Sequence, residues 1–137
     1  MNGVYAAIVT HFDSNLEVDH AAVAAQVHRL IDGGITGIVP NGTVGEGGSL
    51  SSGERREVIE TVVSAVAGRV PVCAGVSAST AEQAAAYARD AKAAGADSVM
   101  TLPPLLYRAD RRELLEFFTA IADAADLPVM IYNNPTA

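Results

Sequence analysis

The segment PNGTVGEGGSL, residues 40–50, follows directly on the apolar run GITGIV and is rich in glycine. Glycine allows a backbone to come close to another group. It therefore suits either a loop that cradles phosphate with its N–H groups or a turn that presents Thr43 at the mouth of a strand. Thr10, Tyr107 and Tyr132 also lie just past apolar runs. The candidate chemistry is therefore that of a small-molecule site built from polar groups at strand ends.

A nucleotide cradle is disfavoured by the spacing of the glycines. Counting from Gly45, a GxGxxG pattern would need glycine where the sequence has Leu50, and the loop also lacks the Gly-Lys-Ser/Thr of a Walker A motif. The remaining interpretation is a threonine held at the end of a buried strand, with Gly42 and Gly45 giving Thr43 and Val44 an unusual backbone shape. A plain turn in which Thr43 only caps the next helix stays open as the alternative.

The cysteine and histidine residues do not indicate a metal site or a thiol-based site. Cys73 is the single cysteine and lies in an apolar run, so one chain can build neither a disulfide framework nor a thiolate cluster. His20 and His28 are eight residues apart, too far for one ion, and His11 stands alone. We expect no metal, and no Ser-His-Asp elbow motif is present.

Composition indicates one globular domain. The chain has 137 residues, of which 50% are hydrophobic and 18% charged, and its net charge is −7. This charge argues against nucleic acid or an anionic membrane surface as a partner. The N-terminal segment lacks the basic region of a signal peptide, and no apolar run approaches membrane-spanning length. A cytoplasmic location is expected.

Five nearly continuous apolar runs predict strands that are buried on both faces. An Ala-rich amphipathic segment of helical length separates each run from the next, which indicates repeated βα units and a parallel sheet. The predicted strands span residues 4–9, 35–39, 70–75, 97–102 and 127–132.

Each helical segment carries a start signal of its own. Side chains that can cap an N-terminus stand before the apolar sets, and two of them form Ser-x-x-Glu capping boxes. The signals are Asp19, Ser51 with Glu54, Ser79 with Glu82, and Asp110 with Glu113.

Five strands and four helices fit either a doubly wound open sheet or the first part of a (β/α)₈ TIM barrel. The barrel is favoured because every crossover has a similar length and because polar residues recur just past the strands, where a barrel builds its active site. An open sheet would also place its site at strand ends, so this alternative remains. We predict a single partial domain, the N-terminal portion of a TIM barrel, over residues 1–137.

Three segments in order, AAIVTHFD, PNGTVGEGGSLSSGER and PVMIYNNP, resemble the dihydrodipicolinate synthase / N-acetylneuraminate lyase family of class I aldolases. The resemblance covers essentially the whole chain. It implies a Schiff-base lyase in which a barrel lysine condenses with pyruvate or a related 2-oxo acid. The protonated imine then serves as the electron sink, so no cofactor is expected. The family is usually a homotetramer, which implies an oligomer here.

The resemblance also assigns roles to residues. Thr43 matches a threonine that joins the proton relay and touches the substrate carboxylate. Val44 stands where many members have a second threonine, so only its backbone N–H remains to bind substrate. Tyr132 matches the tyrosine that carries protons to and from the imine, because a phenol both donates and accepts.

Two positions depart from the family pattern. The relay's second tyrosine, which reaches across a subunit interface, is replaced by Leu106, and Tyr107 is the next residue along. Tyr107 is therefore a possible interface or relay residue only if its loop rearranges. His11 replaces the usual proline after the first strand's threonine.

The imine-forming lysine itself is missing from the sequence. Lys92 is the only lysine, and helical spacing places it near the end of the third helix, whereas the family's lysine belongs on the sixth strand. We therefore expect this 137-residue form to be inactive alone and to be a truncated chain. Two alternatives are a non-catalytic half-barrel that self-associates or is completed by a partner, and an open-sheet phosphate binder.

Overall fold

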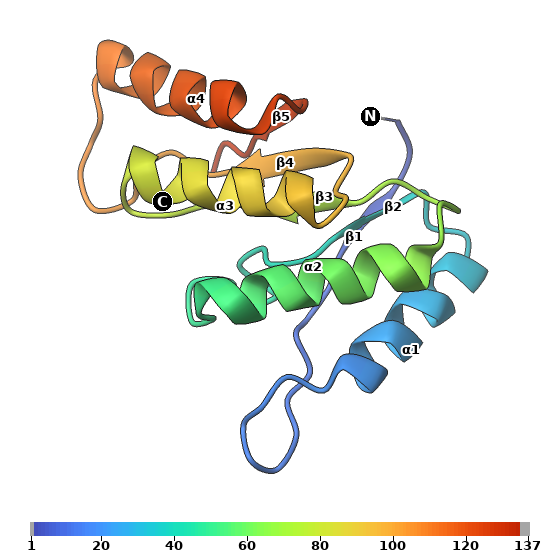
Figure 1. The fold of residues 1–137 in the computed structure, drawn as a ribbon. Coiled ribbons are helices and arrows are strands. Elements are labelled where there is room, and N and C mark those ends of the chain that lie inside the picture. Colours follow the sequence, from blue (N-terminus) through green and yellow to red (C-terminus); the bar gives the residue numbers. More distant parts are fainter. Residues whose placement is uncertain (1, 135–137) are drawn as a thin grey trace.

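Five parallel strands form the centre of the computed structural model, which describes residues 2–134 (Figure 1). All five predicted strands are present, but each is shorter than the apolar run that predicted it. The strands are β1 (Tyr5–Ala7), β2 (Gly37–Val39), β3 (Cys73–Gly75), β4 (Ser98–Thr101) and β5 (Val129–Ile131).

The strands follow one another in space in their chain order. β1 pairs with β2, and β3, β4 and β5 pair in sequence, always in parallel. A parallel bridge between Ile38 and Val72 and a hydrogen bond from Gly75 N to Pro40 O (2.9 Å) join the two groups. A doubly wound sheet would reverse direction after its first strands, so this order fits a barrel and disfavours the open-sheet phosphate binder.

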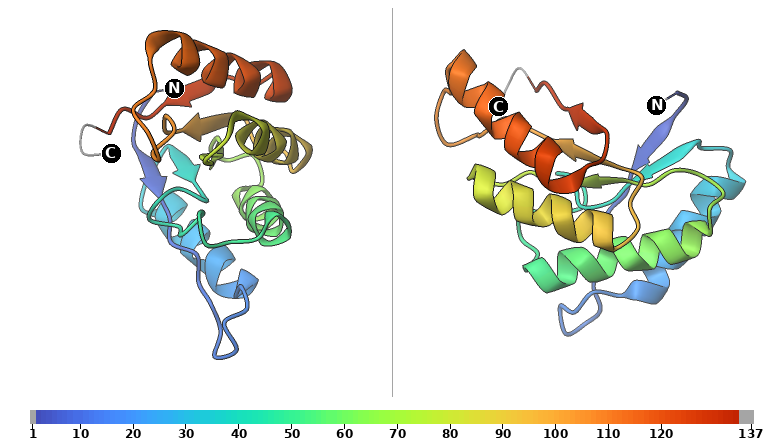
Figure 2. Two further views of the ribbon diagram at one scale, coloured as in Figure 1. Left: turned by 90° about the vertical axis from the view of Figure 1, so that its left-hand side faces the viewer. Right: turned by 45° about the horizontal axis from the view of Figure 1, so that its top comes forward.

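Four helices lie outside the strands, each packed against the next along the chain (Figure 2). Figure 2 (left) shows α2, α3 and α4 stacked on one side of the strands. The apolar stripe of each helix covers the sheet, and the cores centre on Ile38 with Val62 and on Val99 with Ile121. The helices are α1 (His20–Asp32), α2 (Ser52–Val66), α3 (Ala81–Ala93) and α4 (Arg111–Ala125).

The helix starts confirm three of the four predicted signals. Asp19 caps α1, and reciprocal capping boxes open α2 at Ser51 and α4 at Asp110. The prediction for α3 was wrong by one residue, because Thr80, and not Ser79, accepts from Gln83 N at 3.2 Å. Two hydroxyl residues stand in tandem there, and the second has the extended backbone that a cap requires.

β1 and β5 are the two edges of the sheet within the described residues. Each pairs with only one strand, whereas β2 and β3 are buried throughout. Apolar side chains are correspondingly exposed at these edges, including Val4, Val9 and Ile131. Two free edges and exposed apolar groups are features that normally call for further pairing. None of the described helices has the length and apolar character that a membrane crossing demands.

Candidate functional site

The segment between β2 and α2 forms a series of tight turns. Glu46 N donates to Thr43 O at 3.1 Å, and Gly47 N donates to Gly42 O at 3.2 Å. The left-handed conformations belong to Asn41 (φ 58°) and Glu46 (φ 52°), and none of the loop's glycines has a positive φ. The interpretation that Gly42 and Gly45 supply an unusual backbone shape was therefore wrong. Asparagine takes that role at the strand exit, because its short polar side chain tolerates the left-handed region.

Close packing is the reason for three glycines in and beside this loop. A Cβ on Gly45 would lie 2.8 Å from Ile8 O, and one on Gly47 or Gly75 would overlap Asn41 O. The group that comes so close to the backbone is therefore another backbone. The phosphate-cradle interpretation is unnecessary for these glycines.

Thr10, which follows β1, is hydrogen-bonded to the loop after β2. It is buried, and its hydroxyl donates to Gly45 O at 2.7 Å. A buried hydroxyl of this kind contributes to stability, and its single proton is already used. Thr10 therefore positions the loop and does not itself face the pocket described next.

A pocket of about 450 Å³ lies where the loop after β2 meets the segments after β3 and β4. All three segments follow the carboxyl ends of parallel strands, the edge at which α/β barrels build their active sites. The side chains that matter here are Thr43, Arg55, Ser77 and Leu106, which share its wall with glycines of the loop and with Leu102, Pro103 and Leu105.

Thr43 stands exposed on this wall with its functional groups free. No hydrogen bond within residues 2–134 uses its hydroxyl, its amide or the amide of Val44. A helix-capping role for Thr43 is excluded, because Ser51 is the N-cap of α2. The hydroxyl and the Thr43 amide therefore remain available to a ligand. Val44 itself is exposed but does not line the pocket.

Tyr132 lies directly after β5, at the same edge of the sheet. Its amide donates to Thr101 O at 2.8 Å, which continues the pairing with β4, and the residue is 41% exposed. It does not line the pocket that contains Thr43. The motif residue Pro135 lies outside the described residues.

Tyr107 and Leu106 separate in the loop after β4. Leu106, which is 80% exposed, lines the pocket of Thr43, whereas Tyr107 lines another hollow beside the start of α3 and the face of α4. The hydroxyls of Tyr107 and Thr43 are thus presented to different spaces in this chain.

Lys92 occupies the last turn of α3 and pairs with Asp126, Nζ to Oδ2, at 3.0 Å. A cation at a helix C-terminus complements the helix dipole. The structural role predicted for Lys92 is confirmed.

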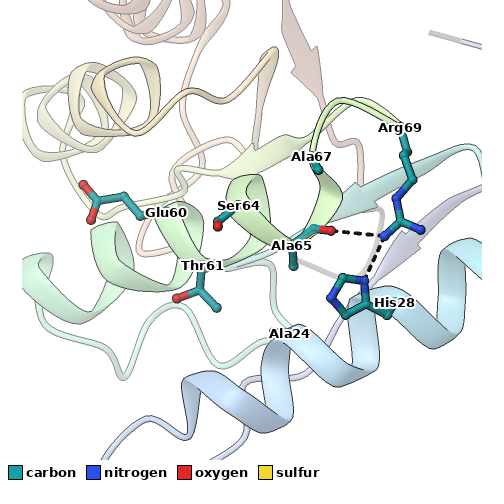
Figure 3. Close-up of a pocket in the computed structure, with 8 residues that line it drawn as sticks. All are labelled: Ala24, His28, Glu60, Thr61, Ser64, Ala65, Ala67 and Arg69. Atoms are coloured by element: carbon teal, nitrogen blue, oxygen red, sulfur yellow. Dashed lines mark hydrogen bonds between the residues drawn. The ribbon is translucent and has the colours of Figure 1, made fainter.

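A larger hollow of about 880 Å³ lies between α1 and α2 (Figure 3). Its cation, Arg69, donates to Ala65 O at 3.1 Å and contacts His28 Nδ1 at 2.8 Å, and Asp32 lies 3.7 Å away. Arg69 therefore satisfies carbonyls at the end of α2. Helices in βα units run opposite to the strands, so this hollow lies at the amino-terminal edge of the sheet, which serves stability in such barrels.

Arg55 is the residue that the motif search missed. It is 3% exposed, and its guanidinium donates to Gly47 O and, at 2.7 Å, to Gly75 O. Burial lowers the pKa of Arg55, and the neighbouring Tyr87 opposes that shift. A signal was present in the sequence: Arg55 shares a helical face with Val58, Ile59 and Val62, all buried.

The comparisons with known proteins agree with this fold. The chain is 41% identical over 134 residues to the 4-hydroxy-tetrahydrodipicolinate synthase of Phenylobacterium zucineum, a match that covers 98% of this chain and 45% of that protein. A crystal structure of dihydrodipicolinate synthase superposes with a TM-score of 0.95 at 38% identity, covering 99% of this chain and 47% of that one. YagE of Escherichia coli K12, solved in complex with pyruvate, gives 0.93 at 30% identity, covering 98% and 45%.

The chain thus spans less than half the length of these relatives, and its five strands and four helices form a partial TIM barrel. The sequence profile of the Dihydrodipicolinate synthetase family matches residues 1–137. Together with the strand order and the pocket at the carboxyl ends of the strands, this match shows that the chain belongs to the dihydrodipicolinate synthetase family.

Proposed function

We propose that residues 1–137 are the N-terminal βα units of a Schiff-base lyase that acts on pyruvate or another 2-oxo acid. The amine of a lysine outside these residues attacks the keto carbon and water leaves, which gives a protonated imine. Loss of a proton from the adjacent carbon then forms an enamine that attacks an acceptor. The observation that carries the proposal is Thr43, whose hydroxyl and amide are free on the wall of a pocket at the strand exits.

Thr43 binds the substrate carboxylate and takes part in proton transfer, and Tyr132 exchanges the proton with the imine adduct. Val44 contributes its backbone N–H. The pocket wall includes one carboxylate, Glu46, and one cation, the largely buried Arg55. YagE, a family relative, was crystallised with pyruvate, which supports a 2-oxo acid as the substrate class.

Imine trapping tests this proposal in a hybrid barrel, in which residues 1–137 are joined to the part of the Phenylobacterium relative beyond the matched segment. Borohydride reduces an imine to a stable amine, so pyruvate plus borohydride is expected to label the hybrid at a lysine outside residues 1–137. The 137-residue chain alone is expected to remain unlabelled, because Lys92 is ion-paired on the outer surface.

Intact-mass and peptide mass spectrometry would locate the label. The matched control is the Lys92→Arg hybrid, which keeps the ion pair with Asp126 and should be trapped as fully as the parent hybrid. Labelling of Lys92 in the parent hybrid or in the 137-residue chain, or loss of labelling in the control, would contradict the assignment.

A non-catalytic, self-associating half-barrel is the second candidate, and the free edges of β1 and β5 favour it. If it holds, the 137-residue chain is expected to form oligomers, and Ile131→Lys should weaken them because a charge on an edge strand opposes strand pairing. Light scattering on a dilution series measures this. Leu115→Lys is the matched control, since Leu115 is also an exposed apolar residue (67%, against 54% for Ile131) but lies on α4 and not on an edge strand. A stable, cooperatively unfolding monomer would eliminate this candidate.

A further inference from the structure

Arg55 is a buried cation for which the proposed reaction has no use. It lies in the first turn of α2, is 3% exposed, and takes part in none of the ion pairs found among residues 2–134. Removing a guanidinium from water without a carboxylate partner is costly. Its hydrogen bonds to backbone carbonyls must offset that cost, so those contacts indicate what the residue is for.

The guanidinium joins two segments that are distant in sequence. One nitrogen donates to Gly47 O in the loop after β2, and the other donates to Gly75 O at the end of β3, at 2.7 Å. The ring of Tyr87, on α3, lies against the guanidinium, with its centroid 4.0 Å from the guanidinium carbon, which is a cation–π contact. Asn41 Nδ2 donates to Arg55 O at 2.8 Å, so the strand exit is tied to the same residue.

These hydrogen bonds fix the chain on both sides of Thr43. The loop is fixed at Asn41, where it leaves β2, and again at Gly47, whose amide closes a turn onto Gly42 O. Thr43 lies between the two fixed points, and its own carbonyl accepts from Glu46 N. The position of the Thr43 hydroxyl in the pocket therefore depends on where the guanidinium holds Gly47 relative to β3.

We infer that Arg55 is a positioning residue that fixes Thr43 against the exit of β3, an inference that rests on the function proposed above. Arginine suits this role because its planar fork addresses two carbonyls at once while its face stacks on an aromatic ring. Lysine offers a single ammonium and cannot hold both carbonyls in the same geometry. Arg55 acts through Thr43 and does not touch the substrate.

The test measures kcat and KM of the hybrid barrel for the exchange of pyruvate methyl protons for deuterium. Arg55→Met is expected to lower kcat on the order of 10²-fold with a smaller change in KM, because a misplacement of about 1 Å has this effect in other active sites. Arg55→Lys should restore little of it. Arg56→Met is the matched control, since Arg56 is the exposed neighbour paired only with Glu60 at 2.8 Å, and it should leave kcat unchanged.

A double-mutant cycle separates positioning from mere stabilisation. If Arg55 acts through Thr43, the double variant Thr43→Val with Arg55→Met should be no slower than Thr43→Val alone. Should Arg55→Met fail to fold, Tyr87→Leu takes its place in the cycle with the same expectation. Additive losses, or an Arg55→Met hybrid with unchanged kcat, would overturn the inference while leaving the proposed function intact. An unchanged kcat in Thr43→Val alone would overturn both.

Discussion

Gly47→Ala is expected to destabilise the chain by about 3 kcal/mol or more, whereas Gly48→Ala should change stability by less than about 0.5 kcal/mol. A Cβ at Gly47 would overlap Asn41 O and lie 2.9 Å from Asn41 C and 3.0 Å from Arg55 Nη1. Neither neighbour can move freely, because Asn41, two residues past β2, donates to Arg55 O and Arg55 in turn donates to Gly75 O. At Gly48 an added Cβ meets nothing within 4 Å.

Urea unfolding followed by circular dichroism measures the difference between these two matched alanine variants. The comparison isolates the effect of the contacts that a Cβ at position 47 would make with Asn41 and Arg55. Both glycines have ordinary negative-φ or extended backbones that alanine can adopt, so backbone strain does not contribute. Equal unfolding midpoints for the two variants would show that the loop can shift to accept the methyl group, and the tie from Arg55 to Gly47 would then not be rigid.

The order and type of the elements could be predicted from the sequence because both depend on local patterns. Buried parallel strands appear as continuous apolar runs, and the capping boxes at Ser51 and Asp110 are defined within four residues. The strand ends were predicted too long, because pairing stops where the chain turns into a loop even though apolar residues continue. Leu102 is such a residue: it is buried directly after β4, and its amide donates to the Ser77 side chain at 3.0 Å.

The interior of the site could not be predicted, because it depends on contacts between distant segments. Gly47 and Gly75 are 28 residues apart, and only the folded chain shows that both face Asn41 and that Arg55 joins them. The phosphate-loop alternative arose for the same reason, since a glycine placed for close packing has the same letter as one placed for a ligand. Arg55 stands beside the exposed Arg56, and in the sequence only its helical spacing to Val58 and Ile59 distinguishes it.

Tyr132→Phe in the hybrid barrel is expected to lower kcat by about 10²- to 10⁴-fold, the contribution typical of a general acid–base group. The change removes one oxygen from a residue that is 41% exposed, so its effect on stability should be small. Exchange of the pyruvate methyl protons for deuterium, followed by NMR, measures the step directly. A C–H proton leaves the imine and a deuteron from solvent replaces it, so no acceptor needs to be known.

Tyr107→Phe is the matched control, because it removes the same oxygen from a tyrosine that lines a separate hollow beside α4. In the hybrid it should exchange the methyl protons at the parent rate unless its loop rearranges or a second subunit brings it to the pocket. Thr43→Val should slow exchange alongside Tyr132→Phe if both hydroxyls take part in the proton relay proposed above. If Tyr107→Phe slows exchange and Tyr132→Phe does not, the relay runs through the loop after β4, and the role assigned to Tyr132 is wrong.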